Sequence, residues 1–253
     1  MLKINNSAEK AELYITGDIV DDTDGATLAA WNLTDGYQWP ADVRAQLDAM
    51  KGKPLTVYIN SDGGSVPAGV AIANMIARHD APTKAVVDGW CCSIATQIFF
   101  AAETREMPEN AYLMIHRPQT GTFGDKDEML RAAAFLETLQ TGLETTYAKA
   151  AREGVTPEQI HDMVEAETWL TGKDAAELFE IDLREAAPVL NCIGGKAAAR
   201  LTPPENIVVN KTEPQAEPQT EPNDAPAFDE VEITKTRAKV KAALAIMKGV
   251  ITK

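Results

Sequence analysis

Two successive strand–turn–helix units place the strongest constraint on how this chain folds. In each unit a short apolar run is followed by a glycine-containing turn and then by apolar residues at helical spacing. Strands that alternate with helices are joined by helical crossovers, so the pattern predicts a largely parallel sheet with flanking helices. Ligands bind at the carboxyl ends of the strands in such sheets, and both turns are expected at that edge. The units comprise a strand at residues 55–59, the glycine-rich turn 60–65, a helix at 66–79, a strand at 84–87, a tight turn through Gly89, and a helix that begins at Ser93.

The rest of the sequence predicts further strands of the sheet. It also predicts a long helix at 126–152 with one apolar side, which ends before Gly154. Residues 21–25 read as a turn-rich acidic segment, and residues 26–39 are ambiguous. The other predicted elements are a strand at 12–19, a helix at 41–50, a strand at 111–115, a helix capped by Thr156 with Pro157 at its first position, an extended turn at 167–171, a short helix at 173–178 and a last small element at 181–183.

The composition changes at Pro203. Residues 203–226 contain six prolines among acidic and amide side chains, which predicts an extended, disordered, acidic linker over 203–230. Residues 231–253 combine basic side chains with one apolar stripe, the pattern of a basic amphipathic helix. Such a helix could dock on its own domain, on another protein or on a membrane surface. The predicted organisation is a globular domain at 1–202, the linker, and the C-terminal helix.

Charge and cysteine content narrow the class of protein. The net charge of −14 argues against nucleic acid as a partner, since nucleic-acid binders present a basic face. The three cysteines form no disulfide framework and have no metal-ligand spacing, which indicates a reducing compartment. The first residues lack the apolar core of a signal peptide, and no apolar run approaches the roughly 18 residues of a membrane span. We therefore expect a soluble, cytoplasmic protein with no membrane partner.

Ser93 and His116 are the candidates for nucleophilic catalysis. Ser93 opens a buried helix, where unpaired N–H groups and the positive end of the helix dipole suit a reaction that builds an oxyanion. His116 ends a buried strand at the edge where Ser93 is expected, the place of a general base. Each residue also has a structural interpretation, Ser93 as a helix N-cap and His116 as a satisfied strand-end side chain. The remaining histidines, His79 and His161, are interpreted as structural and as exposed.

Three other motifs are weaker. The glycine-rich turn 60–65 lacks the lysine of a phosphate-binding loop, and the acidic segment 21–25 lacks the spacing and terminal glutamate of a calcium loop. Cys91 and Cys92 are interpreted as small core residues rather than reactive thiols. We therefore expect no metal and no cofactor.

Four segments with linked order and spacing make the chain recognisable. They are Ile59-Asn-Ser-Asp-Gly-Gly-Ser-Val-Pro-Ala-Gly69, Gly89-Trp-Cys-Cys-Ser-Ile94, Met114-Ile-His-Arg-Pro118 and Glu167-Thr-Trp-Leu-Thr-Gly-Lys-Asp-Ala-Ala176. Together they resemble the Clp protease proteolytic subunit over residues 12–190, and are most similar to its phage branch of head maturation, or prohead, proteases. The resemblance implies an α/β fold of the Clp/crotonase type: a twisted, mostly parallel sheet with flanking helices and a helical handle, for which 126–152 is the candidate.

The resemblance also implies a role for each matching residue. Ser93 corresponds to the nucleophile and His116 to the general base. Glu167 falls where the family has its catalytic aspartate, and Gly64 and Ile94 correspond to the two backbone N–H donors of the oxyanion hole. A carboxylate that accepts the imidazole N–H fixes its tautomer and stabilises the imidazolium, which agrees with these roles.

The chain departs from the family pattern at three places. Glutamate at 167 is one methylene longer than aspartate, so Asp162 and Glu165 remain alternative orienting acids, and the alternative interpretation of Glu167 is a surface carboxylate. Ala166 replaces an arginine that helps couple the rings of the family. The long N-terminal segment that forms axial loops is not matched, which leaves partnership with an unfoldase ATPase open.

The resulting hypothesis is an ATP-independent serine endopeptidase of the Clp type that acts in phage head maturation. Its expected partners are protein substrates, such as capsid or scaffold protein, and copies of itself in a homo-oligomeric ring, in the host cytoplasm or within the prohead. One alternative is a non-catalytic capsid assembly or scaffolding protein on the same fold. A second is a crotonase-type enzyme acting on acyl-CoA, which would not use a serine–histidine pair.

Overall fold

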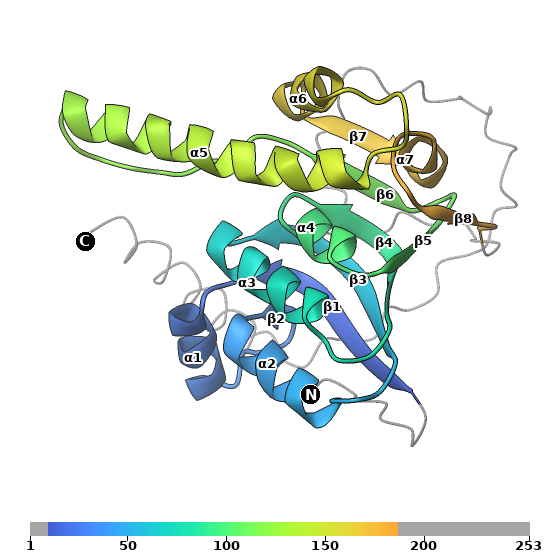
Figure 1. Cartoon of the computed structure of the whole chain (residues 1–253). Coiled ribbons are helices and arrows are strands. Elements are labelled where there is room, and N and C mark those ends of the chain that lie inside the picture. The colour runs from blue at the N-terminus through green and yellow to red at the C-terminus, as the bar shows by residue number, and fades with distance from the viewer. Residues whose placement is uncertain (1–9, 187–253) are drawn as a thin grey trace, which may run out of the picture. The chain divides into compact units, whose positions relative to one another are not determined.

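The computed structural model describes residues 10–186, and within them one sheet runs through the molecule (Figure 1). Its strands follow the order β2-β1-β3-β4-β5-β8, and β6 pairs with both β4 and β7. All pairs are parallel except β6 with β7. The strands are β1 Ala11–Ile19, β2 Tyr37–Gln38, β3 Leu55–Gly64, β4 Thr83–Cys92, β5 Thr104–Pro108, β6 Tyr112–Ile115, β7 Thr168–Thr171 and β8 Asp182–Arg184.

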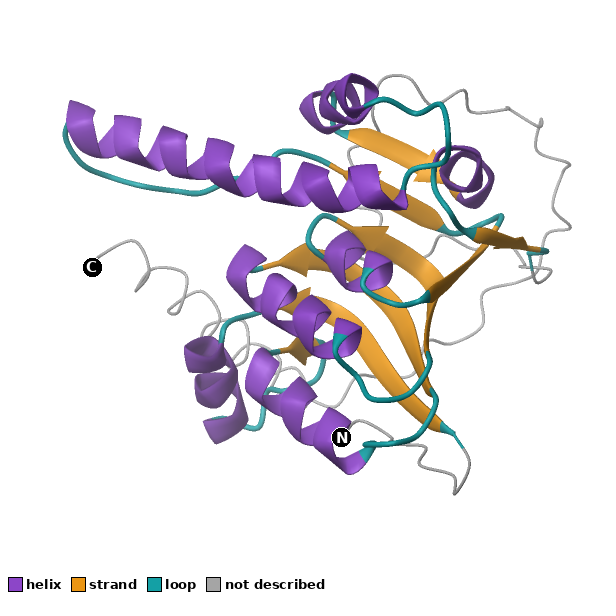
Figure 2. Cartoon of the chain, in the orientation of Figure 1, coloured by secondary structure: helices purple, strands orange, loops and turns teal. Residues whose placement is uncertain are grey.

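Helices α2, α3 and α4 cover one face of β1, β3 and β4, while α5 runs out beyond the sheet as a long rod (Figures 1 and 2). This arrangement confirms the predicted mostly parallel sheet with flanking helices and a protruding helix. The helices are α1 Asp22–Ala30, α2 Pro40–Ala49, α3 Val66–Ala77, α4 Ala95–Phe100, α5 Lys126–Ala150, α6 Pro157–Glu165 and α7 Gly172–Leu178.

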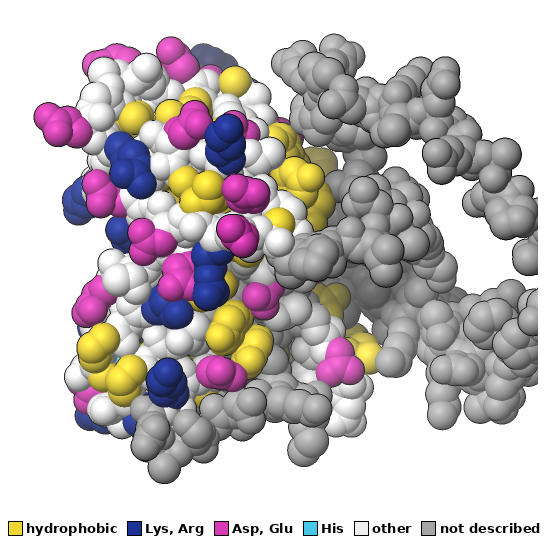
Figure 3. All heavy atoms as spheres, turned by 90° about the vertical axis from the view of Figure 1, so that its right-hand side faces the viewer, with side chains coloured by type: hydrophobic (Ala, Val, Ile, Leu, Met, Phe, Trp, Pro, Cys, Tyr) yellow, Lys and Arg dark blue, Asp and Glu magenta, His cyan; other side chains and the backbone are white. Residues whose placement is uncertain are grey.

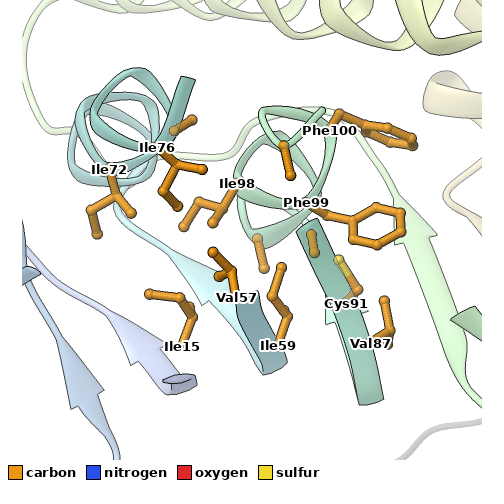
Figure 4. Close-up of a cluster of buried hydrophobic side chains, with 14 of the residues drawn as sticks. Ile15, Val57, Ile59, Ile72, Ile76, Val87, Cys91, Ile98, Phe99 and Phe100 are labelled. Atoms are coloured by element: carbon orange, nitrogen blue, oxygen red, sulfur yellow. The ribbon is translucent and has the colours of Figure 1, made fainter. Parts of the chain in front are cut away.

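The core lies between the sheet and these helices. Alternate residues of β1 and β3 point to this face and are buried, as the period of two along a strand requires. They meet the apolar sides of α3 and α4 in one continuous cluster (Figure 4). Burial of each such side chain contributes about 1.5–3 kcal/mol. The labelled members of the cluster are Ile15, Val57, Ile59, Ile72, Ile76, Val87, Cys91, Ile98, Phe99 and Phe100.

Polar caps fix where the later helices begin. Asp125 and Thr156 each form a capping box, in which the side chain accepts a backbone N–H and the third helical residue bonds back to the cap. Pro157 occupies the first turn of α6, where its missing N–H costs nothing. The predicted start of this helix at Thr156 and Pro157 is therefore confirmed.

The opposite face of the sheet carries charged and aromatic side chains. Glu106 on β5 lies 3.3 Å from the Lys84 ammonium and 3.0 Å from the Arg184 guanidinium, on the neighbouring strands β4 and β8. The rings of Tyr14 and Tyr58 stack across β1 and β3 with their centroids 5.1 Å apart. Figure 3, which views the molecule from the right-hand side of Figure 1, shows acidic and basic side chains mixed with small hydrophobic patches.

Three local predictions are wrong, and one strand was missed. The acidic segment 21–25 is the start of helix α1, which Asp21 caps by accepting the N–H groups of Thr23 and Asp24. The glycine-rich segment is the end of strand β3 and pairs with β1 through Gly64. The expected turn at Gly89 lies inside β4, which continues to Cys92. Strand β5 was not predicted, because its sequence has no apolar alternation.

The predictions for the linker 203–230 and the basic helix 231–253 lie outside the described residues. Within residues 10–186, no helix has the length and apolar character needed to cross a bilayer.

Candidate active site

Ser93 occupies a sharp turn between β4 and α4. Its φ of +55° lies in the left-handed region, which costs a non-glycine residue on the order of 1–2 kcal/mol. The Ser93 N–H donates to the Met114 carbonyl at 2.9 Å, which ties the turn to strand β6. The helix begins at Ala95 with Ile94 as its cap residue, so the interpretation of Ser93 as an N-cap is wrong. Its hydroxyl is free to face the histidine instead.

His116 follows directly after β6 and lies beside Ser93. Its Nε2 is 2.8 Å from the Ser93 Oγ, across 23 residues of sequence. Burial lowers the pKa of His116, and the negative charge of Glu167 opposes this change. The neutral imidazole is therefore favoured near neutral pH, and its unprotonated Nε2 can accept the serine hydroxyl proton. A hydroxyl bonded to such a nitrogen is the arrangement that activates a serine nucleophile.

Two consecutive glycines allow β3 to approach this turn. A Cβ on Gly63 would lie 2.7 Å from the Cβ of Ser93 and 3.2 Å from the Ile94 nitrogen. A Cβ on Gly64 would collide with the Ile19 carbonyl oxygen on β1. The buried Ser61 hydroxyl holds the segment by donating to the Gly17 carbonyl at 2.6 Å and accepting the Gly63 N–H at 3.1 Å. The glycine segment thus lies against Ser93, as the sequence analysis expected.

The Ile94 N–H follows Ser93 at the start of α4. Within the described part of the chain no acceptor bonds this amide, whereas the N–H of Ser93 and the N–H of Thr96 both have acceptors. An unpaired N–H at the first turn of a helix, next to a serine hydroxyl, is suited to bind an oxyanion. The structure therefore brings Gly63 and the Ile94 N–H next to Ser93, whereas the predicted donor Gly64 packs against Ile19 on β1.

Glu167 lies next to His116 but does not contact it closely. Strands β6 and β7 pair antiparallel up to Ile115 and Thr168, so the next position along this register sets His116 opposite Glu167. Glu167 is exposed and has a left-handed φ of +51°. Among the described residues no hydrogen bond joins its carboxylate to the imidazole, and it acts on His116 through its charge.

The two alternative acids point elsewhere. Glu165 accepts from the Arg117 guanidinium at 3.3 Å and from the Gln140 amide at 2.9 Å, which links the end of α6 to α5. Asp162 lies on the exposed side of α6, and in the described part of the chain its side chain does not bond to His116. Of the three carboxylates, Glu167 is the one whose charge acts on the imidazole.

The remaining candidates have structural roles. Burial raises the pKa of the Cys91 thiol well above its usual range, and that of Cys92 to about 12, as expected for core residues. The His79 Nε2 lies 2.9 Å from the Lys53 carbonyl oxygen, and the exposed His161 pairs with Glu144. Among residues 10–186, no three His, Cys, Asp or Glu side chains are grouped to hold a metal ion.

The fold and this serine–histidine arrangement have counterparts among known proteins. The chain matches the family described as Clp protease over residues 41–182, more than half of its length. The chain belongs to the Clp protease family. Two relatives within it are the ATP-dependent Clp protease proteolytic subunits of Streptococcus pneumoniae strains CGSP14 and JJA. Each is 32% identical over 139 residues, which make up 54% of this chain and 71% of the relative.

A solved Clp protease structure shows the same fold. A ClpP1 variant from Listeria monocytogenes matches with a TM-score of 0.56 and 26% identity, over 69% of this chain and 91% of that chain. The predicted Clp-type fold and the resemblance to the Clp protease proteolytic subunit are thereby confirmed. Members of this family are peptidases that assemble into rings and cleave protein substrates.

Sequence reasoning missed three residues that support the site. Gly63 packs directly on Ser93, although only Gly64 was singled out. Thr96 and Tyr147 join the serine turn to α5 through buried hydroxyl groups. A threonine inside a mostly apolar helix was the available signal for Thr96, because a buried hydroxyl needs a partner. No signal in the sequence pairs it with Tyr147, which lies 51 residues away.

Proposed function

We propose that this chain is a serine endopeptidase of the Clp type that hydrolyses peptide bonds without ATP. The observation that carries the proposal is the 2.8 Å contact between the His116 Nε2 and the Ser93 Oγ, in a chain that belongs to a protease family. In this proposal Ser93 is the nucleophile, His116 the general base and Glu167 the orienting acid. The N–H groups of Gly64 and Ile94 form the oxyanion hole.

The geometry supports a two-step acyl transfer. The Ser93 Oγ bonds to the substrate carbonyl carbon while the His116 Nε2 takes the hydroxyl proton, and the negative charge moves to the carbonyl oxygen. The C–N bond then breaks, and the imidazolium passes its proton to the leaving amine. Water attacks the resulting ester, gives one proton to His116, and releases the carboxylic acid as the proton returns to Ser93.

Glu167 assists without a direct bond in this proposal. Its charge raises the pKa of His116 against the stronger effect of burial, so it stabilises the imidazolium that forms during acyl transfer. Because the carboxylate is exposed and water screens its charge, we expect removing it to slow the reaction far less than removing Ser93 or His116.

The proposed biological role is head maturation in a tailed phage, with capsid or scaffold protein as the substrate. The similarity of the four motif segments to phage prohead proteases supports it, as does the tail-like composition beyond the protease domain at 1–202. The acidic linker at 203–230 and the basic helix at 231–253 would link the domain to another protein of the shell. Mass spectrometry of the assembled protein tests this role, since self-cleavage within 203–230 is expected of a maturation protease.

Active-site labelling tests the chemistry. A fluorophosphonate probe is expected to label the purified wild-type chain, and to leave Ser93→Ala and His116→Ala unlabelled. Ser65→Ala is the matched control, because Ser65 is a nearby serine that caps α3 through the Ala68 N–H. Labelling that persists in Ser93→Ala would refute the assignment of the nucleophile. Hydrolysis that requires added ATP would refute ATP independence.

The exposed position of Glu167 favours a second candidate, a non-catalytic assembly protein on the same fold. In such a protein Ser93 and His116 would remain in contact but show no chemistry. A wild-type chain that neither reacts with the probe nor loses its tail in the assembled shell would support this candidate.

A further inference from the structure

A buried chain of hydroxyl groups connects helix α5 to the turn that carries Ser93. The Ser93 carbonyl oxygen accepts the Thr96 N–H at 3.1 Å and the Thr96 hydroxyl at 2.6 Å. The Thr96 Oγ1 also lies 2.7 Å from the Tyr147 hydroxyl oxygen. A threonine hydroxyl has one hydrogen, which is given to Ser93, so Tyr147 is the donor in the second bond. The chain of donors therefore runs from Tyr147 to Thr96 to the Ser93 carbonyl.

Burial makes these hydrogen bonds stronger than the same bonds would be at the protein surface. Thr96 and Tyr147 are 0% and 1% exposed, so water does not compete for their hydroxyl groups. Burial raises the pKa of Tyr147 to about 12, which keeps the phenol protonated as a donor at neutral pH. Leaving either hydroxyl without a partner in this setting would be costly.

These hydrogen bonds matter for the active site because they end on the Ser93 carbonyl. The Ser93 C=O and the Ile94 N–H belong to one planar trans peptide group, in which they point in opposite directions. Any contact that fixes the direction of this carbonyl also fixes the direction of the N–H. We propose that Thr96 and Tyr147 are positioning residues that aim the Ile94 N–H at the oxyanion, an inference that rests on the proposed serine-protease function.

The arrangement makes the site depend on the docking of α5. Figure 1 shows the C-terminal part of α5 next to α4, and the Gln97 amide donates to the Leu143 carbonyl at 3.3 Å as a second contact. Ser93 holds a left-handed φ that needs surrounding contacts to persist. The Tyr147 hydroxyl supplies one of these contacts from a segment far away in the sequence.

Conservative substitutions separate this role from packing. Thr96→Val replaces a hydroxyl by a methyl of similar size, and Tyr147→Phe removes one oxygen atom. The matched control is Thr83→Val, because Thr83 is also buried and its hydroxyl accepts the Glu103 N–H at the opposite end of β4. Thr96→Ser keeps the hydroxyl and serves as the rescue variant. Each variant is measured with a fluorogenic peptide for kcat and KM, by thermal unfolding, and by crystallography.

We expect Thr96→Val and Tyr147→Phe to lower kcat roughly tenfold to a hundredfold with KM within about twofold, since misplacement near 1 Å can cost about a hundredfold. Thr83→Val is expected to lower the melting temperature similarly but to keep its kcat, and Thr96→Ser to restore activity. An active wild-type chain in which Thr96→Val and Tyr147→Phe match the kcat of Thr83→Val would overturn the inference.

Crystallography keeps the two proposals distinguishable. In Thr96→Val the inference expects the Ser93–Ile94 peptide to rotate and the contact between Ser93 and His116 to lengthen beyond 2.8 Å. An unchanged peptide orientation in both variants overturns the inference whether or not the wild-type chain is active. A wild-type chain that cleaves no peptide overturns the proposed function instead. Should Thr96→Val fail to fold, Tyr147→Phe carries the same test.

Discussion

Gly63→Ala tests how closely the glycine segment must approach the serine turn. The new Cβ would lie 2.7 Å from the Cβ of Ser93 and 2.9 Å from the Cys92 carbonyl oxygen. Ordinary van der Waals contact begins at 3.4 Å, so Ser93 must move by about 0.7 Å to admit the methyl group. A displacement of about 1 Å can cost about a hundredfold in rate, and we therefore expect Gly63→Ala to lower the labelling rate of Ser93 at least tenfold.

The same substitution is expected to destabilise the fold without unfolding it. Gly63 has a φ of +99°, outside the range that alanine prefers, at a cost of about 1–2 kcal/mol. The steric collision adds about 1–3 kcal/mol. The combined loss of about 2–5 kcal/mol is smaller than the unfolding free energy of a typical domain, about 5–15 kcal/mol. The variant should therefore be available for kinetic measurement at 25 °C.

Gly154→Ala is the control, because Gly154 has a φ of +96° and its Cβ would meet nothing within 4 Å. It shares the backbone cost of Gly63→Ala and lacks the collision. Urea denaturation gives the two free energies, and fluorophosphonate labelling gives the two rates. Equal labelling rates in the two variants would show that Gly63 does not limit the position of Ser93, and the reasoning from close approach would be wrong.

Two further predictions concern titrating groups. Because burial lowers the pKa of His116, labelling should rise with pH through a midpoint below that of an ordinary histidine, and Glu167→Gln should move the midpoint lower still. A midpoint that rises in Glu167→Gln would contradict the assigned sign. The folded state binds the His116 proton less tightly than the unfolded state, so this group lowers stability as pH falls through the ordinary histidine pKa. In a Cys192→Ser background, Cys91 and Cys92 should resist a disulfide reagent at neutral pH until denaturant is added, since burial raises both thiol pKa values. Rapid reaction of the native protein would show that this part of the core opens readily.

The parallel sheet and its site edge could be predicted because they depend on local pattern. Apolar runs followed by helical spacing determine where β3, α3 and β4 lie, and the carboxyl ends of parallel strands must share one edge. Ser93 and His116 both belong to this edge, and in the structure the Ser93 Oγ lies 2.8 Å from the His116 Nε2.

The errors occurred where tertiary contacts override local preference. Gly63 and Gly64 read as a turn, since glycine weakens a strand, but they pair with β1 as the end of β3, at positive φ values that glycine allows. Helix α1 was missed because its acidic residues resemble a turn, whereas in its first turn they complement the helix dipole. The end of β3 does not follow from a short window of sequence, because it depends on pairing with β1.

The sequence also could not predict whether the Glu167 carboxylate bonds to the His116 imidazole. The Trp-Leu-Thr segment aligned Glu167 with the acid of the family, and the register of β6 and β7 sets it opposite the histidine. Whether a glutamate reaches the imidazole depends on the local backbone, which here adopts a φ of +51°. A backbone angle of this kind is set by packing around the residue and is not encoded in its type.

The length of α5 has a consequence for how the protein behaves as a single protomer. The helix extends about 37 Å at 1.5 Å per residue, yet its buried residues, Leu143, Tyr147 and Ala150, all lie near one end. Its first half carries Met129, Leu130 and Phe135 into solvent, and a helical segment of that length is marginal in water by itself. Amide hydrogens of the first half would exchange through local opening, while those around Tyr147 would await global unfolding. Slowed exchange at the start of α5 would then report directly on assembly, within a single continuous helix.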